Sequence, residues 1–313
     1  MKSRLRELVK KVPVLGKPYV QRDEFRAIVN QLWQRPGHFY SPLPSLDEIK
    51  RSEDTVFDSS TRELGGIDLN ESGQIALFQQ LTRYYRDQPF AELRQDGLRY
   101  HLDNPAFAYC DGIIFYCLLR HVRPRRVMEV GSGYSSCVLL DTNERWFDNR
   151  VSCTFVEPYP QLLHSLITDE DRRRITVLAR NVQDLEAGVF DQLAAGDILF
   201  IDSSHVSKTN SDVNYLFFEI LPRLGSGVWV HLHDMFYPFE YPKQWVYQGR
   251  AWNEAYLARA FLQYNPAFEI QLFNSFLVQF HSDTVMREMP LCARYNKLNM
   301  VPTSAQSLWL RKR

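Results

Sequence analysis

The sequence predicts an α/β protein built on a doubly wound, mostly parallel sheet of seven strands. Three observations lead to this prediction. Short apolar strands alternate with helical segments from about residue 105 onward, a glycine-rich turn joins the first of these strands to its helix, and two apolar segments near the C-terminus are separated by only two residues. Strand–helix alternation at this spacing is typical of parallel sheets, whose right-handed crossovers place helices on both faces.

Five strands are expected in the parallel part of the sheet. They span residues 126–130, 151–157, 174–180, 197–202 and 227–234. Helices are expected before and between them, at residues 105–122, 131–146, 159–167, 185–195 and 210–224. Pro105 is expected in the first turn of the first helix, where proline is well tolerated.

The last two strands are expected to form an antiparallel hairpin. Residues 268–273 and 276–282 are both predicted as strands, and only Asn274 and Ser275 separate them. So short a connection requires a hairpin. A helix at residues 252–264 precedes this pair, and residues 304–313 are compatible with either an edge strand or a segment that covers a cleft.

The first hundred residues follow a different pattern. Residues 35–45 form a loop rich in proline and glycine, and the apolar residues within 72–90 are spaced as on one helix face. We therefore expect a helical and loop cap region at residues 1–100 and an α/β domain at residues 101–313. The basic segment at residues 1–20 favours a solvated helical extension over a helix that lies on a membrane surface.

The composition favours a small-molecule partner over nucleic acid. The chain of 313 residues has 37 basic and 37 acidic residues, whereas nucleic-acid-binding proteins usually have a basic excess.

The five cysteines form no CxxC pair, so neither a disulfide framework nor a structural zinc site is expected. No apolar run is long enough to span a bilayer, and the N-terminus lacks the apolar core of a signal peptide. We expect a cytoplasmic protein, and the sequence leaves a homo-oligomer open.

A glycine-rich turn, EVGSGYSS at residues 129–136, follows the first strand. Gly131 and Gly133 allow the backbone to approach a ligand closely, and the N-terminus of the next helix offers free N–H groups. Ser136 stands where the dinucleotide-binding fingerprint has its third glycine. The pattern is consistent with a nucleoside that has no phosphate, and the alternative is a plain strand–helix connection.

Glu157 strengthens the prediction of a nucleoside site. It ends the second strand, where a carboxylate can accept hydrogen bonds from two ribose hydroxyls. The acid alone does not separate NAD from other nucleosides, and an exposed acid at a strand end is the alternative.

Five segments taken in order resemble class I S-adenosylmethionine-dependent methyltransferases. They are RRVMEVGSGYSSCVLLDTNE, FVEPYP, NVQDL, FIDSSH and HLHD, and the predicted hairpin also matches the sheet of that family. The similarity covers roughly residues 105–281. It implies a Rossmann-like fold, S-adenosyl-L-methionine as the cofactor, and residues 101–313 as the methyltransferase domain.

The resemblance also implies which residues surround the cofactor. Those expected around its methionine part are Glu129, Gly131, Ser132, Gly133, Ser135 and Ser136. Glu157 would hold the ribose, Asp184 would face the adenine amine, and Val182 or Gln183 would lie beside the ring. Asp202, at the end of the fourth strand, would border the cofactor.

Titratable side chains gather at the ends of the fourth and fifth strands. Asp202 ends the fourth, His233 and Asp234 end the fifth, and His205 follows Asp202 by three residues. Ligands of open α/β sheets bind beyond the carboxyl ends of the strands, so we expect these groups at the mouth of a cleft. Packing explains such a group poorly, because burying unpaired charge is costly, although Asp202 as a simple turn cap is the alternative.

Metal-dependent sugar O-methyltransferases have a similar pattern at these two strand ends. By this resemblance Asp202 and Asp234 would bind a divalent cation, Mg²⁺ or Mn²⁺, and His205 would be the base. His233 departs from the pattern, because it stands where the first acid of a pair is expected. It is either a third metal ligand, which favours Mn²⁺, Fe²⁺ or Zn²⁺ over Mg²⁺, or a second catalytic base without a metal.

The sequence thus predicts an S-adenosylmethionine-dependent O-methyltransferase that acts on a hydroxyl of a small molecule, such as a sugar or a natural product. Asp202 would position the hydroxyl with Asp234, and His205 would remove its proton. Two alternatives use the same fold: metal-assisted chemistry without methyl transfer, and a non-catalytic cofactor-binding protein with a regulatory or assembly role.

Overall fold

The computed structural model describes residue 29, residues 32–294 and residues 303–313. The chain forms two compact units, Met1–Val56 and Phe57–Arg313. This division does not coincide with the boundary expected near residue 100. The basic helix predicted within residues 1–20 lies outside the described residues.

The described part of the first unit consists of a loop and two short helices, α3 (Leu46–Arg51) and α4 (Glu53–Val56). The predicted loop at residues 35–45 is confirmed, and the Gly37 amide closes it by donating to the Leu43 carbonyl (3.1 Å).

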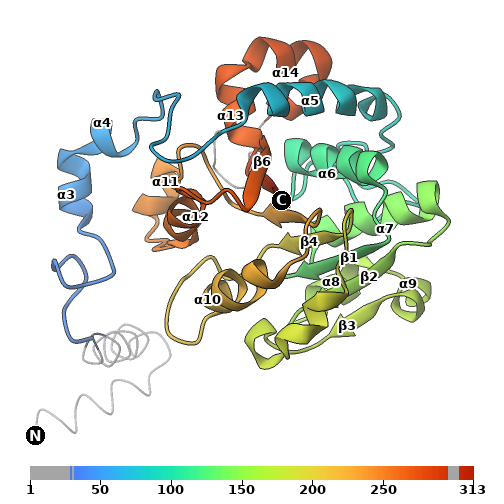
Figure 1. Cartoon of the computed structure of the whole chain (residues 1–313), viewed down its shortest axis with the longest axis horizontal. Helices are drawn as coiled ribbons and strands as arrows, with labels where there is room; N and C mark the ends of the chain where they lie inside the picture. Colours follow the sequence, from blue (N-terminus) through green and yellow to red (C-terminus); the bar gives the residue numbers. More distant parts are fainter. Residues whose placement is uncertain (1–28, 30–31, 295–302) are drawn as a thin grey trace, which may run out of the picture. The chain divides into compact units, whose positions relative to one another are not determined.

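A seven-stranded sheet forms the centre of the second unit, in the order β3-β2-β1-β4-β5-β7-β6 (Figure 1). β1 to β5 pair in parallel, whereas β7 runs antiparallel to both β5 and β6. The predicted fold class is therefore confirmed. The strands are β1 (Arg126–Val130), β2 (Ser152–Val156), β3 (Thr176–Leu178), β4 (Ile198–Ile201), β5 (Trp229–Leu232), β6 (Phe268–Phe273) and β7 (Leu308–Lys312).

Helices lie before, between and after the parallel strands. Those up to β5 are α5 (Glu71–Tyr85), α6 (Tyr109–Val122), α7 (Tyr134–Phe147), α8 (Gln161–Leu166), α9 (Asp169–Arg174) and α10 (Asp212–Tyr215). Those after β5 are α11 (Lys243–Tyr247), α12 (Glu254–Leu262), α13 (Asn274–Phe280) and α14 (Ser282–Glu288). The helix predicted at residues 185–195 is instead a short 3₁₀ helix, Ala187–Gln192. None of the helices within the described residues is long and apolar enough to cross a membrane.

The α5 segment explains why residues 57–100 belong to the second unit. The helix packs against α6 and β6 (Figure 1). Just before it, the Asn70 side-chain amide donates to the Ile270 carbonyl (2.9 Å), and within it the Gln74 side chain accepts from the Phe273 amide (2.7 Å). These bonds satisfy backbone groups of the edge strand β6, so this segment completes the sheet edge.

The prediction that Pro105 lies in the first turn of a helix was wrong. α6 begins at Tyr109, and the preceding residues form a turn around Asn104. The Asn104 side-chain oxygen accepts from the amides of Ala106 and Phe107 (3.1 and 2.7 Å). Hydrogen bonds from the backbone to an asparagine side chain favour a turn, so these residues do not continue into the helix.

The prediction that residues 276–282 form the second strand of the hairpin was also wrong. These residues lie in α13 and at the start of α14, and β6 pairs instead with the C-terminal strand β7. A short apolar run fits a helix face as well as a strand, so its pattern alone does not decide. β7 is an interior strand between β5 and β6, which neither of the two readings of residues 304–313 foresaw.

A buried aspartate on α6 anchors the segment that leads into β7. The Asp111 carboxylate accepts from the Gln306 amide (3.0 Å), the Ser307 hydroxyl (2.7 Å) and the Asn274 side chain (2.9 Å).

The five cysteines are buried, as expected for thiols that pack in the core.

We predict that the interior position of β7 makes its side chains essential to stability. Leu310 is fully buried and pairs with Val230 on one side and Ile270 on the other. Leu310→Ala should lower the free energy of unfolding by about 2–5 kcal/mol, because the neighbours cannot fill the space. Urea denaturation would measure this. The matched control Leu93→Ala, at a site that is 74% exposed, should change it by less than about 0.5 kcal/mol. A Leu310 variant as stable as the control would contradict the prediction.

Candidate active site

Hydrogen bonds between strands continue past the ends of β1, β4 and β5 and fix the positions of the residues that follow. The Gly131 amide donates to the Val156 carbonyl (3.0 Å), the Asp202 amide to Val130 (2.8 Å), and the His233 amide to Ile201 (3.0 Å). The residues predicted at these strand ends therefore lie along one edge of the sheet.

Gly131 must be glycine because the structure leaves no room for a side chain at this position. Its φ is +82°, and a Cβ at this position would lie 1.7 Å from the Asp202 carbonyl oxygen. Any side chain would therefore displace the end of β4. Gly133 has an extended φ of 177°, which imposes no such requirement.

A cavity of about 360 Å³ lies at the ends of β1, β2 and β4, and its volume is within the range of small-molecule sites. Of the residues predicted to bind a cofactor, four line it: Gly131, Glu157, Gln183 and Asp202. Lys208 lines it as well.

Polar atoms without a partner mark this cavity. Gln183 Oε1 and Ser203 Oγ, from two lining residues, and Ser132 Oγ, next to the lining residue Gly131, are buried and have no hydrogen-bond partner in the structure. Buried polar atoms are normally paired, so these three are available to a ligand.

Glu157 is held by its own loop. Its carboxylate accepts from the amides of Ser132 (3.0 Å) and Tyr159 (2.8 Å). Because each carboxylate oxygen can accept more than one hydrogen bond, this arrangement orients Glu157 and still leaves capacity for hydroxyl donors.

Glu129, Ser135 and Ser136 form a buried cluster beneath the turn and do not line the cavity. Both serine hydroxyls donate to the Glu129 carboxylate, and Ser136 Oγ also accepts from the Gly133 amide (3.1 Å). Burial raises the pKa of Glu129 to about 8. In this structure the three residues stabilise the turn through these hydrogen bonds.

Asp184 also lies outside the set of residues that line the cavity. It ends a 3₁₀ turn, Val182–Asp184, and its carboxylate accepts from the Asn181 side chain (2.8 Å). Val182 and Gln183 of the same turn do line the cavity.

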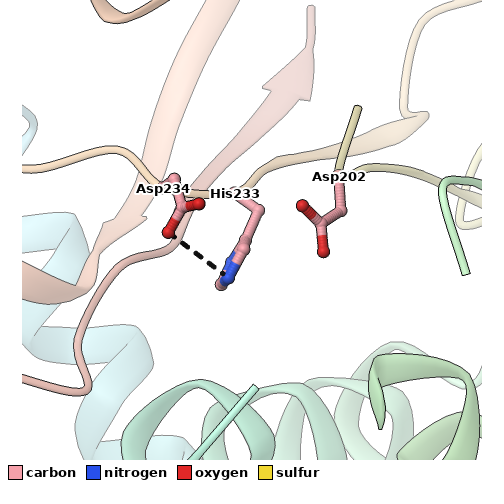
Figure 2. A group of neighbouring side chains, drawn as sticks. All are labelled: Asp202, His233 and Asp234. Atoms are coloured by element: carbon pink, nitrogen blue, oxygen red, sulfur yellow. Dashed lines mark ion pairs between the residues drawn. The ribbon is translucent and has the colours of Figure 1, made fainter. Parts of the chain in front are cut away.

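Asp202, His233 and Asp234 form a cluster next to the cavity (Figure 2). One ligand atom of each lies within 4.8 Å of those of the other two. His233 Nε2 is 3.6 Å from an Asp234 oxygen, and Figure 2 shows this histidine between the two carboxylates. Two carboxylate oxygens and an imidazole nitrogen at this spacing can hold a divalent cation.

His205 joins the cluster from the loop after β4. Its Nε2 is 3.4 Å from an oxygen of Asp202 and 3.4 Å from an oxygen of Asp234. Although burial lowers its pKa, hydrogen bonds with the Asp202 and Glu254 carboxylates raise the pKa of His205 well above its ordinary value. Although burial raises the pKa of Asp202, the nearby His233 and His205 lower it to about 2.

Glu254 is the residue of this cluster that the sequence did not reveal. It begins α12, is 1% exposed, and its carboxylate lies 2.8 Å from His205 Nδ1. Its backbone amide and that of Asn253 also donate to the His205 carbonyl (3.2 and 3.1 Å). An acid in the first turn of a helix is ordinary, because it complements the helix dipole. Burial distinguishes Glu254, and burial is not visible in the sequence at this position.

His231 lies deeper and outside the cluster. Its Nε2 is hydrogen-bonded to Ser307 Oγ (2.9 Å), and its ring stacks on Phe200 with the centroids 3.8 Å apart. These contacts make it a packed core histidine.

Comparison with known proteins places the chain in a family. Residues 128–235 match the model of a family described as "Methyltransferase domain". An uncharacterised protein of Archaeoglobus fulgidus is 30% identical over 184 residues, which cover 56% of this chain and 82% of that protein. The chain therefore contains a methyltransferase domain, and at this level the resemblance of its sequence to S-adenosylmethionine-dependent methyltransferases is confirmed.

Solved structures of methyltransferases are similar at low sequence identity. The S-adenosylhomocysteine-bound methyltransferase PaMTH1 of Podospora anserina is 11% identical with a TM-score of 0.41, and the match covers 87% of this chain and 99% of that one. The O-methyltransferase TomG of Streptomyces achromogenes, in complex with S-adenosylmethionine, is 17% identical with a TM-score of 0.39, and the match covers 71% of this chain and 90% of that one.

We predict that the methyltransferase without cofactor becomes less stable as the pH rises, in part because of Glu129. Its pKa of about 8 lies above the ordinary value of 4.5, so between these values the folded state holds a proton that the unfolded state has released. The stability that Glu129 contributes is present below pH 4.5 and is lost as the pH rises through about 8. The contribution to the slope is at most about 1.4 kcal/mol per pH unit.

Glu129→Gln should remove this contribution, whereas Glu219→Gln, at an exposed position, should leave the slope unchanged. Urea denaturation at pH 6, 7 and 8 gives the comparison. Equal slopes in the wild type and the Glu129 variant would contradict the prediction.

Proposed function

We propose that the enzyme transfers the methyl group of S-adenosylmethionine to a hydroxyl oxygen of a small organic acceptor. The position of Asp202 carries the proposal. Asp202 lines the cavity that also contains Gly131 and Glu157, and its carboxylate is 3.4 Å from His205 Nε2. A single side chain thus lies between this cavity and the imidazole of His205, which can accept a proton when it is in its neutral form.

We assign the nucleoside part of the cofactor to the cavity at the ends of β1, β2 and β4. Glu157 is oriented to accept from the ribose hydroxyls. The unpaired Oε1 of Gln183 is suited to accept from the adenine amine, because it is a buried acceptor that lacks a donor. Gly131 lines this cavity without a side chain, which allows a ligand to approach the backbone closely.

His205 is the base in this proposal, and Glu254 is its positioning residue. A hydroxyl must lose its proton as it attacks the methyl group, and an imidazole nitrogen is suited to accept that proton. Glu254 holds Nδ1 of His205 at 2.8 Å, so the other ring nitrogen, Nε2, faces the two carboxylates. That orientation fixes which nitrogen carries the proton and which is free to accept one.

The donor set of Asp202, His233 and Asp234 fits a divalent cation. When bound, such a cation would acidify the acceptor hydroxyl. The imidazole ligand favours Mn²⁺ over Mg²⁺. The same carboxylates raise the pKa of His205, so positive charge held between them favours the neutral form of His205 that a base requires.

A methyl-transfer assay tests the proposed function. The purified protein, S-adenosylmethionine and a panel of sugars and phenols should yield S-adenosylhomocysteine and a product heavier by one CH₂, whereas the corresponding methyl ethers should not react. EDTA should abolish turnover and Mn²⁺ should restore it more effectively than Mg²⁺. Methylation of amines or thiols alone would refute the hydroxyl specificity, and full activity in EDTA would refute the cation.

We predict that His205→Asn lowers kcat by about 10²-fold or more, the usual contribution of a general base. The affinity for S-adenosylhomocysteine, measured by calorimetry, should stay within about twofold, because His205 does not line the cofactor cavity. Glu254→Gln should cause a smaller loss of kcat, since the amide oxygen can still accept from Nδ1. The control His164→Asn, on α8, should leave both quantities unchanged. An unaltered kcat in the His205 variant would remove it as the base.

A further inference from the structure

Arg250, in the loop between α11 and α12, packs against aromatic rings. The Arg250 guanidinium lies over two indole rings, 4.2 Å from the centroid of Trp245 and 5.1 Å from that of Trp252. Within the described part of the chain, its side chain forms no ion pair or hydrogen bond. Arg99, by contrast, is half-buried and binds three carboxylates.

This loop lies against the candidate active site. The Trp252 ring, which contacts Arg250, also contacts the His205 ring, with the centroids 4.5 Å apart. Asn253 at the end of the loop donates its amide to the His205 carbonyl and accepts from the Ser207 amide (2.6 Å). The Trp252 ring therefore links the guanidinium to His205, whose Nε2 lies 3.4 Å from both Asp202 and Asp234.

Stacking leaves Arg250 prepared to bind a planar anion. The indole rings cover a face of the guanidinium and restrict its movement, while its N–H donors lie along its edge. This edge matches the two oxygens of a carboxylate or the oxygens of a phosphate. An arginine placed only to balance Asp234 would be expected to pair with it directly, and the structure contains no such ion pair between the two described residues.

We propose that Arg250 binds an oxyanion of the methyl acceptor, so that the preferred acceptor is a hydroxylated carboxylic acid. The inference rests on the proposed function for the identity of the reacting hydroxyl. It adds a charge requirement: a neutral sugar or alcohol leaves the guanidinium edge without a partner, whereas a hydroxy acid satisfies it. Lys208 does not take this role, because it lines the cofactor cavity.

The test measures binding, so it does not depend on turnover. The protein loaded with S-adenosylhomocysteine is titrated with benzoate, phenyl phosphate and the neutral benzamide, and calorimetry gives each Kd. Benzoate should bind and benzamide should not. Tighter binding of phenyl phosphate than of benzoate would assign the oxyanion to a phosphoryl group and overturn the carboxylic-acid assignment.

Two variants locate the site. Arg250→Gln should raise the Kd for benzoate by at least about tenfold, the effect of losing a hydrogen bond to a charged group. Arg250→Lys should recover only part of the affinity, because an ammonium group lacks the planar fork. The control Arg259→Gln, at an exposed position of α12, should bind benzoate like the wild type. All variants should keep the wild-type affinity for S-adenosylhomocysteine and the wild-type Tm.

The outcomes separate this inference from the proposed function. Equal Kd values for benzoate in the wild type and Arg250→Gln, or no binding of either anion, would overturn the inference even if hydroxyls are methylated. Benzoate binding that depends on Arg250 supports the oxyanion site even if the methyl-transfer assay fails, and that failure would then count against the proposed function alone.

Discussion

The close approach of Gly131 to the carbonyl oxygen of Asp202 is the constraint on which the arrangement of this enzyme depends. It exists because β1 and β4 are neighbours in the sheet and continue their pairing past their last residues. With no side chain at Gly131, the turn after β1 and the loop after β4 come together without displacement. Gly131 and Asp202 both line the cavity at this junction, and Asp202 also belongs to the cluster with His233 and Asp234. In the proposed function, this one backbone contact therefore sets the position of the cofactor relative to the reacting hydroxyl.

The charges at this edge are interdependent. The carboxylates of Asp202, Asp234 and Glu254 surround His205, and His233 lies between two of them. Each carboxylate stabilises positive charge, whether it is a proton on an imidazole or a bound cation. A cation between Asp202 and Asp234 and a proton on His205 therefore compete for the same stabilisation. Arg250 lies apart from this competition, because among the described residues its guanidinium contacts two indole rings and no carboxylate.

The sequence predicted the parts of the site that depend on the backbone. The parallel strands followed from the alternation of apolar segments, and strand ends in a parallel sheet meet at one edge, so Gly131, Glu157 and Asp202 could be placed together. The role of Asp184 as a cofactor contact stays a prediction, because its neighbour Gln183 is the one that lines the cavity. Whether the side chain at a given position of a loop faces the ligand depends on the exact course of that loop, which periodicity does not specify.

Two features depended on contacts between distant segments and could not be predicted. Glu254 is separated from His205 by 49 residues, and only the fold reveals that its carboxylate is buried against that ring. The residues after β6 have an apolar pattern that fits a strand, yet the hydrogen-bonding partner of β6 is supplied by the C-terminal segment. Asp111 on α6 holds that segment, and a buried acid in a helix gives no local indication of the segment that it binds.

The interior position of β7 also determines the order in which the sheet can be completed during synthesis. β1 to β5 follow one another in the chain and form a continuous parallel sheet. β6 is made next, but within the described residues its one strand neighbour is β7, which begins at Leu308 and pairs on its other side with β5. The residues at the ends of β1, β2, β4 and β5 can therefore be brought together while the chain is still emerging from the ribosome, whereas the far edge must wait for the strand that closes the gap.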